Sequence, residues 1–92
     1  MAIQKKRMLV MEEIDVTRVL SIINQHQGYF SDDTKIVKNY GLKNEPTKWV
    51  IKFNASDKEW KLMTKDLGEI GEIIVKVTPG GTTDMYFIRN EL

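Results

Sequence analysis

Apolar residues recur at every second position in the middle of the chain, at Trp49, Ile51 and Phe53. This period of two is typical of a β-strand that buries one face. Ser56 and Glu59 follow at the spacing of a capping box, in which the Ser56 hydroxyl and the Glu59 carboxylate each accept from the other residue's backbone N–H. The middle of the chain therefore predicts a strand that leads straight into a capped helix.

The remaining hydrophobic patterns predict one more helix and four more strands. Residues 8–11 are all apolar, which is typical of a central strand that is covered on both faces. Asp15 is the predicted N-cap of a first helix that ends near Gly28, and the second helix is predicted to end near Gly68. Further strands are predicted over residues 35–42, 72–78 and 84–89.

These elements follow one another in the order β-α-β-β-α-β-β within a single predicted domain, residues 1–92. Two amphipathic helices and about five strands bury their apolar sides most simply when both helices cover one face of a sheet. The predicted fold class is therefore α+β, a two-layer sandwich with a mainly antiparallel sheet of four or five strands. Right-handed crossovers would make the first six elements ferredoxin-like. A winged variant, in which the last hairpin projects from the sheet, has the same element order.

Composition places the chain among ordinary globular domains, with 41% hydrophobic and 29% charged residues. Cysteine is absent, which excludes disulfides and cysteine-based metal sites. The apolar run near the N-terminus is too short for a signal peptide or a membrane span. We therefore expect a cytoplasmic protein with no membrane association.

Residues with catalytic or ligand-binding potential all have structural explanations. Acidic residues cluster at 12–15 and 32–33 and could hold a divalent ion, but the first cluster suits a helix start and the second a turn. His26 has neither a cysteine nor a second histidine with which to share a metal. Gly80 and Gly81 precede a strand and not a helix, which favours a hairpin turn over a phosphate-binding loop. We expect no enzymatic activity, no cofactor and no metal.

The main candidate for function is the sheet face that the two helices leave uncovered. If Trp49, Ile51 and Phe53 point toward the helices, residues of the opposite parity face away, and many of them are apolar. A patch of this kind usually contacts another protein or a second copy of the chain, unless a terminal segment covers it. We therefore expect a small regulator or inhibitor, of the type common in compact phage-like genomes, that docks on a protein partner or forms a dimer. Its predicted apolar centre is Val50, Ile74, Tyr86 and Ile88, with a rim of Lys48, Lys52 and Lys76.

The alternative is a nucleic-acid-binding regulator. Residues 35–65 carry eight lysines against three acidic residues, although the net charge of the chain is only +1. Such lysines could follow a phosphate backbone. A row of lysines is also what any amphipathic helix presents to water, and most aromatic residues that could stack on bases are assigned to the core. The residues of this predicted surface are Lys58, Lys61, Lys65, Lys43, Lys48 and Lys52.

Overall fold

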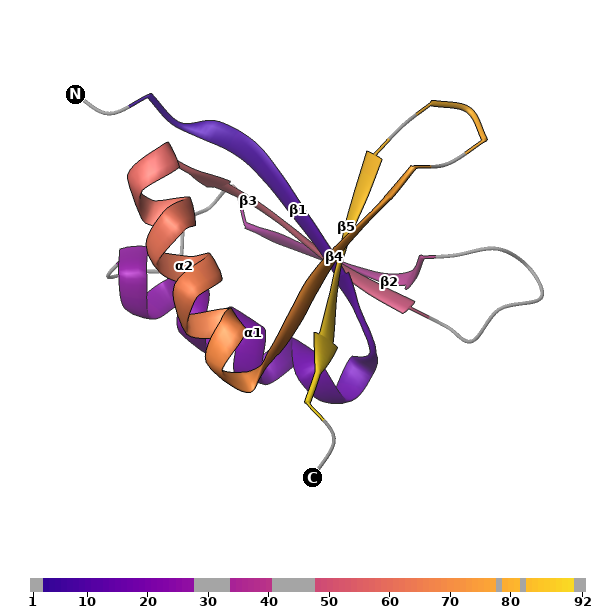
Figure 1. The fold of residues 1–92 in the computed structure, drawn as a ribbon, viewed down its shortest axis with the longest axis horizontal. Helices are drawn as coiled ribbons and strands as arrows, with labels where there is room; N and C mark the ends of the chain where they lie inside the picture. The colour runs from indigo at the N-terminus through magenta and orange to yellow at the C-terminus, as the bar shows by residue number, and fades with distance from the viewer. Residues whose placement is uncertain (1–2, 28–33, 41–47, 78, 82, 91–92) are drawn as a thin grey trace.

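The computed structural model describes residues 3–27, 34–40, 48–77, 79–81 and 83–90. The described elements confirm the predicted order (Figure 1). Neither described helix has the length and apolar content needed to span a membrane. The elements are β1 (Lys5–Met11), α1 (Glu13–Gln27), β2 (Lys35–Tyr40), β3 (Lys48–Ala55), α2 (Asp57–Ile70), β4 (Gly71–Val77) and β5 (Thr83–Arg89).

The five described strands form one mixed sheet with the order β2-β3-β1-β5-β4. All neighbouring strands are antiparallel except β1 and β5, which are parallel and pair only at Val10 with Tyr86. The predicted two-layer α+β fold is therefore confirmed. The β2-β3-β1 half has the ferredoxin-like arrangement, but β5 takes the place beside β1 that β4 would occupy in that fold. The last hairpin thus extends the sheet and is not a projecting wing.

Both helices pack on one side of the sheet (Figure 1). The core lies between them and the strands, where β1 and β3 contribute residues of one parity, as the alternation around Ile51 predicts. β1 lies between two other strands, which confirms the predicted central position, and Leu9, Val10 and Met11 are all buried although the helices cover only one side of the sheet. The buried core residues are Leu9, Met11, Val19, Ile23, Ile51, Phe53, Ala55, Met63, Leu67 and Phe87.

The helix boundaries differ from the predicted ones at two points. α1 begins at Glu13, so Asp15 lies in its first turn and is not the N-cap. The predicted stop of α1 at Gly28 and the predicted turn at 31–33 lie outside the described residues. α2 continues past Gly68 to Ile70, because a glycine inside a helix costs only about 1 kcal/mol and does not by itself end it.

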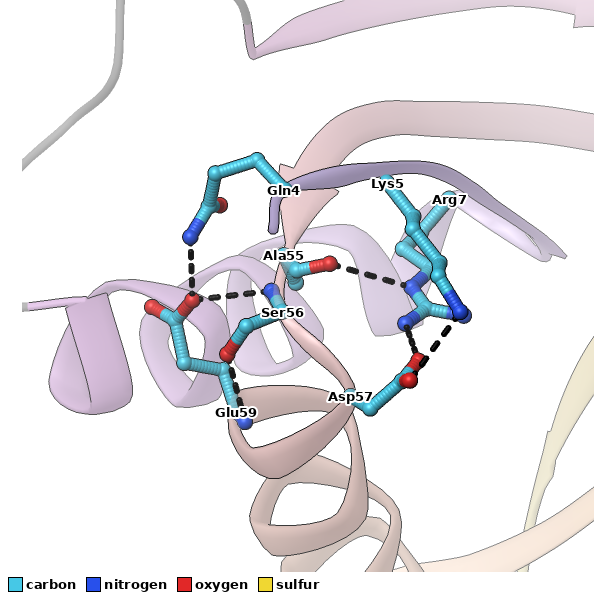
Figure 2. Close-up of polar contacts among 7 residues, drawn as sticks. All are labelled: Gln4, Lys5, Arg7, Ala55, Ser56, Asp57 and Glu59. Atoms are coloured by element: carbon cyan, nitrogen blue, oxygen red, sulfur yellow. Dashed lines mark hydrogen bonds and ion pairs between the residues drawn. The ribbon is translucent and has the colours of Figure 1, made fainter. Parts of the chain in front are cut away.

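The predicted capping box at the start of α2 is confirmed (Figure 2). The Glu59 N–H donates to the Ser56 hydroxyl at 3.1 Å, and the Ser56 N–H donates to the Glu59 carboxylate at 2.9 Å. Gln4, just before β1, donates to the same carboxylate at 3.0 Å. The backbone N–H of Ser56 is the main reason that the pKa of Glu59 lies below its ordinary value of 4.5.

Asp57 joins the first turn of α2 to β1 (Figure 2). Its carboxylate accepts from the Arg7 guanidinium at 2.8 Å and from the Lys5 ammonium at 3.0 Å. Arg7 also donates to the backbone carbonyl of Ala55 at 3.3 Å. The hydrogen bond from Arg7, followed by the one from Lys5, lowers the pKa of Asp57 below its ordinary value of 3.8. The N-terminal half of β1 is thus tied to the β3–α2 junction.

Candidate functional site

The candidate site is the side of the sheet opposite the two helices, which we call the open face. Strand pairing places one residue from each strand in a single row across it. The row is apolar from edge to edge, with an aromatic ring next to the last position. In sheet order it consists of Val37, Val50, Val10, Tyr86 and Ile74.

Val50 is not available to a partner, contrary to the sequence-based prediction. Both Val50 and its neighbour Val10 have 0% of their surface exposed, although both lie on the open face. Val50 stands in the middle of three strands, opposite Val10 on one side and Val37 on the other. Lys48 and Lys52 lie two residues away on the same face, where their aliphatic stems can shield a short valine side chain.

The accessible apolar surface of the open face lies around these two valines. Ile88 is 47% exposed and Val37 is 38% exposed, whereas Ile74 and Tyr86 are half-buried. The ammonium of Lys76 lies 4.7 Å from the centroid of the Tyr86 ring, a cation–π distance. Of the four predicted centre residues, Ile74, Tyr86 and Ile88 can therefore contribute contact area and Val50 cannot.

The three predicted rim lysines have different surroundings. Lys76 and Lys52 are exposed, whereas Lys48 is half-buried and its ammonium lies 3.8 Å from the carboxylate of Glu12. Lys52 stands directly opposite Lys35 in the β2–β3 pair. Like charges at such a position destabilise a sheet unless something compensates for them.

A groove of about 630 Å³ opens between β1 and β5 beside this lysine pair. It reaches from the open face toward the helix side, because the two strands pair at one position only. Its lining combines apolar side chains with several cations and no acidic residue. The apolar part comes from Met8, Phe53 and Met85, the basic part from Lys6, Arg7, Lys35 and Lys52, and the rest from Asn54 and Thr83.

The basic end of the open face therefore consists of Lys6, Lys35 and Lys52. All three are exposed, and within the described part of the chain none of them forms an ion pair. Arg7, the remaining cation of the groove, is already bound to Asp57. Among the described residues, three lysines without an ion-pair partner thus lie together at one end of the sheet, beside the groove.

The predicted nucleic-acid surface is divided between two sides of the molecule. Lys58, Lys61 and Lys65 are exposed on α2, which packs on the helix side of the sheet. Lys48 and Lys52 belong to the open face, since they share the parity of Val50. The sixth predicted residue, at position 43, lies outside the described residues.

The acidic residues near the start of α1 serve the fold. Arg89, at the end of β5, donates to Glu12 at 3.1 Å and to Asp15 at 3.2 Å, and only 4% of the Asp15 side chain is exposed. The hydrogen bond to Glu12, followed by the negative charge of Asp15, raises the pKa of Arg89. These contacts join β5 to α1 and give the acidic cluster a structural role.

The other candidate residues also occupy structural positions. His26 Nε2 lies 2.5 Å from Asp66 Oδ2 and so connects α1 to α2. Gly81 has a φ of 86° in the turn between β4 and β5, which confirms the predicted hairpin turn. No group of three potential metal ligands occurs among the residues that the structure describes. The acidic pair at 32–33 falls outside them.

Sequence reasoning missed the groove and the contribution of Lys6 to the basic end. Periodicity assigns each residue to a face but does not say which strands are neighbours, and the groove depends on β5 lying beside β1. The isolated pairing of Val10 with Tyr86 has no local sequence signal.

No protein family, no curated protein and no solved structure matches the chain.

Proposed function

We propose that this chain is a small non-catalytic binding protein, a regulator or inhibitor, that docks on a protein partner or on a second copy of itself through the open face. The observation that carries the proposal is the combination, on one side of the sheet, of exposed apolar side chains and lysines that have no ion-pair partner in the described part of the chain. Ile88 and Val37 are the most exposed apolar residues there, and Lys6, Lys35 and Lys52 form its basic end.

The exposed apolar residues support a protein as the partner. Contact with another apolar surface would remove Ile88, Val37 and the half-buried Tyr86 from water, at about 25 cal/mol for each Å² buried. Tyrosine is among the residues enriched at protein interfaces, because its ring adds contact area at little entropic cost. Base stacking is less well supported, since Phe53, the aromatic residue of the groove, is only 2% exposed.

The basic end supports a partner surface that carries acidic residues. Lys35 and Lys52 repel each other across the β2–β3 pair, and a carboxylate placed between them would replace that repulsion with attraction. The groove next to them offers Met8 and Met85, whose flexible side chains adapt to different apolar partners. An acidic segment with an apolar side chain would use both features.

The proposal is tested by placing carboxylates on the exposed apolar positions of the open face. We expect the Val37→Glu, Ile88→Glu double variant to lose partner capture from an extract of the expressing cells by about tenfold or more, because charges would be buried without partners. Leu62→Glu is the matched control, since Leu62 is 43% exposed on α2. This control variant should retain wild-type binding.

Two results would contradict the proposal. One is equal binding by the open-face variant and the Leu62→Glu control. The other is salt-sensitive retention on DNA that is abolished by Lys61→Glu with Lys65→Glu, which would support the nucleic-acid alternative on the helix side.

A further inference from the structure

The two edges of the sheet are protected differently. β2 has a register irregularity between Val37 and Tyr40 and carries Lys35 and Lys38, and bulges and lysines are features that keep edge strands from pairing with other chains. β4 pairs with β5 in unbroken register over its whole length, and no described strand pairs with its outer side. β4 is therefore the edge that can accept another strand.

The sequence of β4 is complementary to itself in one antiparallel register. Ile74 is the midpoint of Gly71–Val77, so a second β4 centred on the same residue pairs along the full length of the strand. This register, in which each copy contributes the same surface, places Glu72 of each copy opposite Lys76 of the other. Both side chains are exposed, and neither forms an ion pair within the described part of the chain.

The helix side of β4 is complementary in the same register. Val75 and Val77 belong to that side but are 55% and 71% exposed, because the outer end of the hairpin extends beyond the helices (Figure 1). α2 runs directly into Gly71 and contacts the opposite end of β4. In an antiparallel pair the end of one strand lies beside the start of the other, so the second copy's helix layer would stand next to the uncovered valines.

We propose that β4 is a homodimerisation edge, at which two copies of the chain join their sheets into one continuous ten-stranded sheet through antiparallel β4–β4 pairing centred on Ile74. We take the added strand to be a second copy of β4 because, among its antiparallel self-pairings, this register alone pairs the full strand length and places Glu72 opposite Lys76. It also places the exposed Val75 and Val77 beside the second copy's helix layer. The inference does not depend on the proposed docking function. It involves the sheet edge and would place the two open faces side by side.

The first test is a charge swap measured by analytical ultracentrifugation. Glu72→Lys and Lys76→Glu should each raise the dimer dissociation constant about tenfold or more, since the two-fold symmetry turns two attractive pairs into two repulsive ones. The double variant should restore dimerisation, because the charges again oppose each other. Lys65→Glu on α2 is the control and should dimerise like the wild type.

The second test uses the absence of cysteine from the chain. Ile74→Cys should form a covalent dimer on mild oxidation, because residues that face each other across the two-fold axis lie within disulfide range. Leu62→Cys, at a more exposed position on α2, should remain monomeric on a denaturing gel.

Three outcomes would overturn the inference. They are a wild-type chain that stays monomeric, a dimer that does not respond to either single charge reversal, and a double variant that remains as weak as the single variants. None of them bears on capture of a different protein by the open face, so the edge proposal can fail while the docking proposal stands.

Discussion

At the scale of single residues, the absence of a side chain at Gly71 allows α2 to pass directly into β4. A Cβ atom built on Gly71 would lie 2.4 Å from the carbonyl oxygen of Ile88 and 2.7 Å from the Phe87 ring. Both neighbours are held in β5, and the backbone of Gly71 is extended, so the requirement concerns space and not a special φ angle. Gly68, three residues earlier, has no such neighbour and lies within the helix.

Alanine substitutions at these two glycines should have opposite effects. Gly71→Ala should lower the free energy of unfolding by about 1–3 kcal/mol or more, because the new methyl group overlaps backbone and ring atoms. Gly68→Ala should raise it by about 0.5–1 kcal/mol, because alanine favours the helix and restricts the unfolded chain. Urea denaturation monitored by circular dichroism measures both changes. Equal changes in the free energy of unfolding for the two substitutions would contradict the close approach of Gly71 to Ile88 and Phe87.

At the scale of elements, the start of α2 is the part of the fold that the sequence predicts most accurately. Alternation identifies β3 and the capping box identifies the following helix, because both signals act between residues close in the chain. The contacts of Asp57 with Lys5 and Arg7 could not be predicted in this way, since they join segments about 50 positions apart. The prediction that Asp15 is the N-cap of the first helix is wrong for the same reason. Asp15 contacts Arg89, which is far away in the sequence, and this contact gives it a different role.

The carboxylates of this junction predict how stability depends on pH. The pKa values of Asp57 and Glu59 are lower in the folded chain than their ordinary values of 3.8 and 4.5. Both groups therefore contribute stability above those values, and the contribution is lost as the pH falls through the folded pKa values. The Asp57→Asn, Glu59→Gln double variant should be less stable than the wild type at about pH 7, and the difference should shrink toward about pH 3.

Urea midpoints across this pH range test that expectation. Glu69→Gln, which removes an exposed carboxylate near the other end of α2, controls for the loss of a negative charge on the helix. A stability difference that stays constant or grows as the pH falls would mean that the contacts in Figure 2 do not hold the charged carboxylates in solution.

At the scale of the whole molecule, the sequence predicts the two-layer architecture but not the neighbours of each strand. Hydrophobic periodicity assigns Val50 to the side of the sheet away from the helices, and the structure agrees. Periodicity cannot show that Val10 and Val37 flank Val50 and leave it without exposed surface. The exposed large apolar residues of the described open face are therefore Ile88 and Val37, and only the strand order places them on one face with the basic groove.

The central claim, that the open face is the docking surface, is tested most directly by lysine labelling followed by mass spectrometry. Acetylation rates would be compared between the free chain and the complex it forms in an extract of the expressing cells. The open-face lysines Lys6, Lys35 and Lys52 should be acetylated several-fold more slowly in the complex, whereas Lys58, Lys61 and Lys65 on α2 should react as in the free chain. Protection of the α2 lysines with unchanged rates at the three open-face positions would contradict the account.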